Sequence, residues 1–109
     1  MTTRRVAHVI GLRPEAIEEY DRLHADVWPA VLDRLRASNI RNDSIYRYGT
    51  MLFSYFEYRG DDFDSDMANM AADAATQRWW SITVPMQIPV PEQTPEGGWF
   101  AIPEVFHTD

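Results

Sequence analysis

The sequence Tyr-Asp-Arg-Leu-His-Ala-Asp-Val-Trp-Pro, at positions 20–29, lies in the middle of a segment from Pro14 to Ser38 whose apolar residues recur with a helical period. Side chains three or four positions apart share one face of a helix. The set that does so here is Ile17, Tyr20, His24, Val27, Val31 and Leu35. Leucine or valine would serve at position 24. Because an unpaired buried polar group costs about 1–3 kcal/mol, we expect His24 either to be hydrogen-bonded or to take part in chemistry.

Two prolines shape this segment. Pro14 suits the first helical position, where its missing N–H is no loss. Pro29 falls inside the segment, where a proline removes one backbone hydrogen bond and crowds the preceding turn. The sequence therefore predicts a kink or short break at residues 26–28, which would leave His24 close to the end of the first half.

Three segments have the composition of β-strands. Residues 4–12 mix β-branched and small side chains, and residues 40–48 and 51–58 flank Gly49-Thr50, which is typical of a hairpin connection. Because side chains alternate between the two faces of a strand, Asp43 is expected on the face opposite to that of its two neighbours.

The second half of the chain predicts two helices over residues 63–84, separated at Asp73. The acidic residues at 61–66 lack the glycine and the closing glutamate of an EF-hand loop, so we interpret them as helix caps and not as a calcium site. A loop rich in proline and glycine follows over residues 85–98, and loops of this length are often functional. Residues 99–107 are expected to form a last strand.

The order strand, helix, strand, strand, helix, strand predicts one α+β domain over residues 1–109. Its core would be a four-stranded antiparallel sheet with helices on one face. The other face then needs a cover, and the short chain has 14 aromatic residues. We therefore expect a second copy of the chain to cover that face in a homodimer.

The composition excludes several kinds of partner. The net charge of −7 argues against nucleic acid, and no apolar run approaches the about 20 residues of a membrane span. A neutral small molecule is the easier ligand. The chain has no cysteine and so no disulfide, thiol nucleophile or thiolate metal site, which fits a cytoplasmic location.

Four groups of residues resemble the L-rhamnose mutarotase family, in matching order and spacing over nearly the whole chain. They are Tyr20-x3-His24-x3-Trp28-Pro29, Ser44-Ile45-Tyr46, Gln77-Arg78-Trp79-Trp80 and Glu104-Val105-Phe106. The resemblance implies a ferredoxin-like βαββαβ fold of the dimeric α/β barrel type. It also implies an isomerase that interconverts the α and β anomers of a six-carbon deoxysugar.

The resemblance further implies roles for single residues. His24 matches the family's proton donor, and Tyr20, Trp79 and Trp80 match residues that line its sugar site. Adjacent residues on a helix point about 100° apart, so we expect one tryptophan to stack on the sugar and the other to pack. Asp43 departs from the family, which usually has a sugar-contacting tyrosine there. A carboxylate forms hydrogen bonds with different hydroxyls than a phenol does, so we expect the substrate to be L-rhamnose, L-fucose or a related aldose.

Mutarotation needs little apparatus, because the ring oxygen gains a proton as the anomeric hydroxyl loses one. No metal, redox centre or other cofactor is required. A histidine with a pKa near the working pH can supply the acid, typically for a factor of about 10²–10⁴. Asp43 or Tyr20, or a water held by either, could take the hydroxyl proton.

Other interpretations stay open on the sequence alone. His24 could be a hydrogen-bonded core histidine, Asp43 could merely pair with an arginine, and His8 could belong to the core, the site or the dimer interface. Dimeric α+β barrels of this size also host haem-handling and quinol-oxidising monooxygenases, and a non-catalytic sugar-binding module would use the same residues. Fold alone does not choose among these functions.

Overall fold

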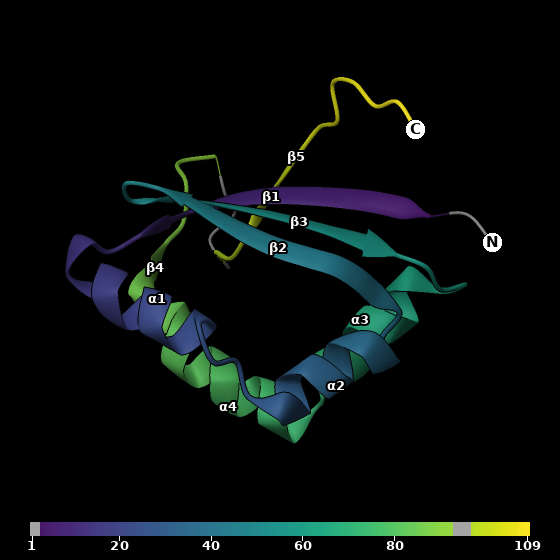
Figure 1. Cartoon of the computed structure of the whole chain (residues 1–109), viewed down its shortest axis with the longest axis horizontal. Helices are drawn as coiled ribbons and strands as arrows, with labels where there is room; N and C mark the ends of the chain where they lie inside the picture. Colours follow the sequence, from purple (N-terminus) through teal and green to yellow (C-terminus); the bar gives the residue numbers. More distant parts are fainter. Residues whose placement is uncertain (1–2, 93–96) are drawn as a thin grey trace.

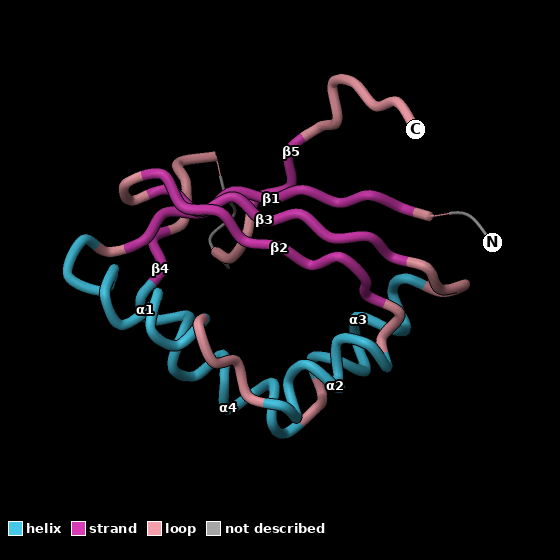
Figure 2. Tube along the Cα trace, viewed as in Figure 1, coloured by secondary structure: helices cyan, strands magenta, loops and turns pink. Residues whose placement is uncertain are grey.

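The computed structural model describes residues 3–92 and 97–109. Its elements lie in two layers, with the sheet above and the helices below it in Figures 1 and 2. In chain order they are β1 (Arg4–Leu12), η1 (Pro14–Ala16), α1 (Ile17–His24), α2 (Pro29–Ala37), β2 (Ile40–Tyr48), β3 (Met51–Tyr58), α3 (Phe63–Ala71), α4 (Ala74–Thr83), η2 (Val84–Met86), β4 (Gln87–Ile88) and β5 (Phe100–Ile102). No helix among these residues is long and apolar enough to span a bilayer.

The sheet is antiparallel throughout, with the order β2-β3-β1-β4 and with β5 also paired to β1. This is the order of a ferredoxin-like chain, so the predicted α+β fold with helices on one face is confirmed. The last strand differs from its prediction over residues 99–107. Two short strands, β4 and β5, share that edge of β1, and the chain leaves the sheet at Pro103, which has no N–H to donate to a ladder. Residues 93–96 of the predicted loop lie outside the described residues.

The break predicted at residues 26–28 is present. α1 ends at His24, and α2 begins at Pro29. Between them Trp28 is extended (φ −57°, ψ 133°), the conformation that the residue before a proline prefers. The two helices run in different directions and form the arms of a V below the sheet (Figure 1). His24 therefore lies at the end of the first arm, as expected.

Acidic side chains begin the next two helices. The Asp62 carboxylate accepts a hydrogen bond from the backbone N–H of Ser65 at 3.1 Å. Asp73 accepts from both the backbone N–H and the hydroxyl of Thr76, at 3.0 and 2.9 Å. These contacts satisfy donors that the first turn of a helix leaves unpaired, which agrees with the interpretation of the acidic run as helix caps.

The core is divided into two clusters. The first joins the sheet to the start of α1 and consists of Ile10, Leu12, Ala16, Tyr20 and Leu52. The second lies among the helices and consists of Leu23, Val31 and Trp79. Met86 packs against both clusters. Because the helices of the V are inclined to the sheet, the two clusters do not fill all of the space between the layers.

Candidate functional site

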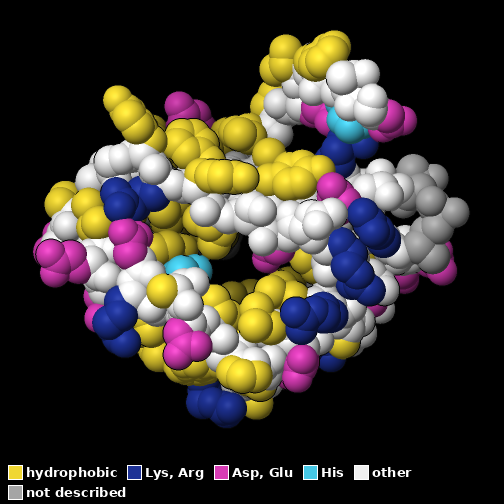
Figure 3. Space-filling view, viewed as in Figure 1, with side chains coloured by type: hydrophobic (Ala, Val, Ile, Leu, Met, Phe, Trp, Pro, Cys, Tyr) yellow, Lys and Arg dark blue, Asp and Glu magenta, His cyan; other side chains and the backbone are white. Residues whose placement is uncertain are grey.

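A cavity of about 830 Å³ lies between the sheet and the helices. Figure 3 shows its opening, bordered largely by hydrophobic side chains. The candidate site residues Tyr20, His24, Asp43, Trp79 and Trp80 all line it. Residues from one strand and two helices, far apart in sequence, thus meet in one pocket. Its volume lies within the range of small-molecule sites.

His24 occupies the helical wall of this cavity. Its Nδ1 lies 2.9 Å from the backbone oxygen of Tyr20. Because a carbonyl oxygen only accepts, Nδ1 carries the hydrogen, and Nε2 is the nitrogen that can exchange a proton with a ligand. The imidazole also stacks on the ring of Tyr20, with centroids 4.2 Å apart and planes 23° from parallel. These contacts fix the orientation of the imidazole.

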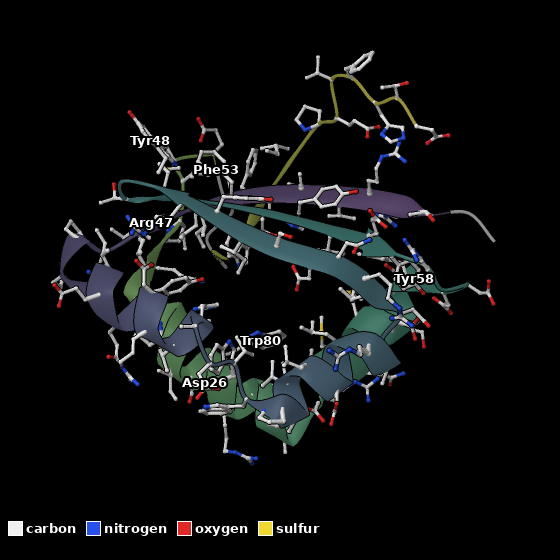
Figure 4. All side chains as sticks on the ribbon, viewed as in Figure 1. Asp26, Arg47, Tyr48, Phe53, Tyr58 and Trp80 are labelled. Atoms are coloured by element: carbon white, nitrogen blue, oxygen red, sulfur yellow. The ribbon has the colours of Figure 1, made fainter. Side chains whose placement is uncertain are left out.

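The two tryptophans of α4 occupy different environments. Trp79 is buried beside Leu23 and Val31, and it meets the His24 ring edge to face, with centroids 5.2 Å apart. Trp80 is 38% exposed and lies on the helical side of the cavity (Figure 4). The structure therefore places one indole mainly in packing and leaves the other accessible, as the 100° separation predicts.

Tyr20 is almost fully buried, and its hydroxyl is hydrogen-bonded to the side chain of Gln87. Burial raises the pKa of the Tyr20 phenol, and the hydrogen bond from Gln87 acts in the opposite direction. Gln87 lies on β4 and lines the cavity. No sequence pattern marks Gln87 as a site residue, although it falls within the loop over residues 85–98 that was expected to be functional.

Asp43 lies on β2 beside a bulge. The pairing with β3 shifts register between Arg41 and Ser44, and Asn42 has a left-handed backbone (φ 52°) that asparagine tolerates better than most residues. The amide of Asn42 donates to Glu57 at 3.0 Å. Asp43, the next residue, lines the cavity on the other side of the sheet.

The alternative that Asp43 merely pairs with an arginine is wrong for the residues that the structure describes. Arg47 forms an ion pair with Asp21 at 2.7 Å. Arg41 donates hydrogen bonds to the backbone carbonyls of Arg36 and Ile40. Arg78 forms no ion pair with Asp43 either. The carboxylate remains open to the solvent in the cavity, but the protein around it displaces part of its hydration, which raises the pKa of Asp43.

The two other histidines lie in contrasting places. His8, on β1, is half-buried and lines the cavity, so it belongs to the helix-facing side of the sheet and not to the outer face. His107 lies on the C-terminal segment, exposed, with Nε2 3.0 Å from the Asp109 carboxylate. Among residues 3–92 and 97–109, no group of three or more His, Asp or Glu side chains is arranged to hold a metal ion.

The remaining wall of the cavity is apolar. It is formed by α2, α3 and the start of β2 through Leu32, Leu35, Ile40, Phe63, Met67 and Met70. The polar lining side chains come from the sheet, from α1 and from α4. The cavity can thus offer hydrogen-bonding groups to the hydroxyls of a ligand and an apolar wall to its C–H surface.

Comparison with known proteins assigns this arrangement to a family. The model of the L-rhamnose mutarotase family matches residues 5–108. The L-rhamnose mutarotase of Ligilactobacillus salivarius is 33% identical over 98% of this chain and 99% of its own length. That of Phocaeicola vulgatus is 29% identical over 97% of this chain and 99% of its own.

Two solved structures share the fold. An L-rhamnose mutarotase from Formosa agariphila superposes with a TM-score of 0.75 at 20% identity, covering 97% of this chain and 99% of that one. The tetracenomycin F2 cyclase of Streptomyces glaucescens superposes with a TM-score of 0.62 at 15% identity, covering 96% and 95%. At these identities the likeness concerns the architecture alone.

The partly desolvated carboxylate of Asp43 leads to a stability prediction. A folded-state pKa above that of the unfolded chain means that ionised Asp43 destabilises the fold near neutral pH, and that this cost disappears as the pH falls through the raised pKa. We expect Asp43→Asn to raise the Tm at pH 7, and the gain to shrink towards pH 3, as measured by calorimetry. Asp61→Asn, at an exposed position, is the matched control and should show no such trend. A Tm at pH 7 lowered by Asp43→Asn would contradict the prediction.

Proposed function

The chain belongs to the L-rhamnose mutarotase family, and from its site we propose that it interconverts the α and β anomers of an L-6-deoxyhexose by opening and closing the sugar ring. The observation that carries the proposal is the placement of His24. Its Nδ1 is held by the Tyr20 carbonyl, which leaves Nε2 for a ligand in a cavity lined by indole and phenol rings.

In the proposed reaction, His24 acts as the general acid. Protonated Nε2 donates to the ring oxygen as the C1–O5 bond breaks, and the anomeric hydroxyl loses its proton as the C1=O1 bond forms. Rotation about C1–C2 and the reverse proton transfers close the ring on the other face. The Tyr20 carbonyl accepts from Nδ1–H throughout and stabilises the imidazolium form.

The other side chains would position the sugar. Trp80 offers an accessible indole face to the C–H surface of a pyranose, and the Tyr20 hydroxyl, oriented by Gln87, offers a hydrogen bond. The Asp43 carboxylate can accept hydrogen bonds from two adjacent hydroxyls. L-Rhamnose presents a cis pair at C2 and C3, and L-fucose presents one at C3 and C4, so Asp43 is the residue that would distinguish them.

The proposal includes a homodimer formed through the outer face of the sheet. Tyr46, Tyr48 and Phe53 on that face are 67, 81 and 39% exposed, and Figure 4 shows Tyr48 and Phe53 on the side away from the helices. Val105 and Phe106 on the C-terminal segment are 95 and 80% exposed. Large exposed apolar surfaces of this kind mark interfaces. A cytoplasmic location stays a prediction.

Replacement of His24 tests the catalytic role. His24→Gln keeps a polar side chain of similar size but cannot supply the proton, so we expect the protein's acceleration of anomer exchange to fall by a factor of about 10²–10⁴. The measurement is magnetisation exchange between the anomeric proton signals of L-rhamnose and, separately, L-fucose. His107→Gln removes a histidine outside the cavity and should leave the exchange unchanged.

Three results would count against this function. Binding of either sugar in a titration, with anomer exchange left at its spontaneous rate, would identify a non-catalytic binding module. Full activity of His24→Gln would remove the assigned acid. Uptake of haem by the purified protein would favour the monooxygenase alternative.

Replacement of Asp43 tests the choice of sugar. Asp43→Tyr restores the residue that the family usually has, and a phenol cannot accept from two adjacent hydroxyls as a carboxylate does. We expect the ratio of the L-rhamnose rate to the L-fucose rate to rise in this variant. Asp43→Asn, which keeps the shape and removes the charge, is the matched comparison. A ratio unchanged in both variants would exclude Asp43 from sugar selection.

Replacement of Tyr46 tests the dimer. A carboxylate at this largely exposed position costs the folded monomer little, but it would be buried without a partner in an interface formed by the outer face. We therefore expect wild-type protein to have twice the monomer mass in light scattering and Tyr46→Asp to have the monomer mass. Ile82→Asp, on α4 at the opposite layer, should remain dimeric. A monomeric wild-type protein would refute this part of the proposal.

A further inference from the structure

His8 lies where the core ends and the cavity begins. Alternate residues of β1 face the helices, and two of them, Ile10 and Leu12, are fully buried in the first core cluster. His8 is the next helix-facing residue on the strand, and it is only half-buried and lines the cavity. It pairs in register with Ser54 of β3, which lines the same cavity. The sheet therefore presents an imidazole to the ligand space.

His8 lines the cavity from the sheet, and His24 lines it from the helical layer. α1 lies in the helical layer below the sheet (Figure 1), and Tyr20 packs in the same cluster as Ile10. From Tyr20 to His24 the helix advances one turn, about 6 Å. From Ile10 to His8 the strand spans two residues, about 6.6 Å. Each imidazole thus lies one step beyond this shared cluster on its own layer, and both line the cavity.

The surroundings of His8 hold its ring but leave its nitrogens available. The imidazole stacks on Phe56, with centroids 6.0 Å apart, and meets Trp99 edge to face at 6.5 Å. Within the part of the chain that the structure describes, neither ring nitrogen is hydrogen-bonded to a protein group. Its nitrogens are also not sealed from solvent, because no fully buried unpaired side-chain nitrogen is present there.

The protonation state of His8 suits a proton acceptor. Burial lowers the pKa of its imidazole, so the ring is neutral at pH 7. The titratable groups that share the cavity with it are Tyr20 and His24 from α1 and Asp43 from β2. The described residues of β3, α3, α4 and the Gly98–Trp99 segment that line the cavity carry no titratable side chain.

We propose that His8 is the second proton-transfer group of the mutarotase, the base that takes the proton of the anomeric hydroxyl. This inference rests on the function proposed above and adds a catalytic residue to it. As the C1–O5 bond breaks, its electron pair goes to O5, which takes the proton of His24. The O1–H proton passes to His8 as the C1=O1 bond forms. After rotation about C1–C2 the two transfers reverse, so both histidines return to their starting states.

A base on β1 also gives Asp43 a separate role. The most effective general base has a pKa near the working pH, and an imidazole comes closer to that than a carboxylate does. Asp43 then remains a hydrogen-bond acceptor for hydroxyls away from C1. The sheet would supply both groups, the base from β1 and the hydroxyl anchor from β2.

The test compares His8→Gln and His8→Phe with wild-type protein in the anomer-exchange assay, over pH 4 to 9. We expect kcat to fall about 10²-fold in both variants while KM changes less than about threefold. In wild-type protein, kcat/KM should fall on the acidic side with an apparent pKa below the ordinary 6.5 of histidine. This decrease of kcat/KM at low pH, the acidic limb of the profile, should be absent or displaced in His8→Gln. His107→Gln should keep the wild-type profile.

Each other outcome overturns the inference. A kcat within threefold of wild type, a loss confined to KM, or an unchanged acidic limb in His8→Gln would leave His8 as a packing or binding residue. Should both variants fail to fold, ¹⁵N spectra of the wild-type imidazoles decide, because a His8 ring whose nitrogen signals do not respond to saturating sugar does not touch it. If wild-type protein does not accelerate exchange, the proposed function fails. If it does, and only His24→Gln is inactive, the role of His8 alone fails.

Discussion

The break before Pro29 is the constraint on which the site depends. A continuous helix from residue 14 to residue 38 would lie along the sheet with one uninterrupted apolar stripe, and it would close the space that now forms the cavity. Proline prevents this, because it cannot donate the hydrogen bond that a continuing turn needs and because it pushes Trp28 into an extended conformation. The stripe is therefore divided between two helices, and the second core cluster, with Leu23 of α1 and Val31 of α2, spans the break.

An ion pair and hydrogen bonds join the sheet to the helices at the two ends of the cavity. At one end Arg47 of β2 binds Asp21 of α1 at 2.7 Å, and at the other the Tyr58 hydroxyl at the end of β3 donates to Asp66 of α3 (Figure 4). Asn39 also donates to Asp66, at 3.0 Å. These contacts join the sheet to the helices at both ends of the cavity. They can therefore hold the two layers at a fixed separation without side chains that cross the cavity itself.

Much of this architecture could be predicted because it follows from local rules. Pro29 marked the break, Gly49-Thr50 marked the hairpin, and periodicity put His24 and Tyr20 on one helix face. The errors concern contacts that local patterns do not encode. The last strand is shorter than predicted because Pro103 ends its pairing, and Gln87 went unrecognised because its partner, Tyr20, is distant in sequence. Asp43 has arginine neighbours in sequence, but Asp21 from another element binds Arg47 instead.

The unpaired polar groups of the cavity determine what kind of molecule can bind in it. His24 has the hydrogen bond at Nδ1 that a structural histidine needs, but neither its Nε2 nor the carboxylate of Asp43 has a partner among the described residues. Water in the cavity can solvate such groups. A ligand that displaces this water without replacing its hydrogen bonds would leave each group unsatisfied, at about 1–3 kcal/mol apiece. An apolar ligand would therefore bind poorly, whereas a pyranose brings hydroxyls for these groups and C–H faces for the indoles. The architecture shared with a polyketide cyclase does not determine the ligand; the unsatisfied side chains in the cavity do.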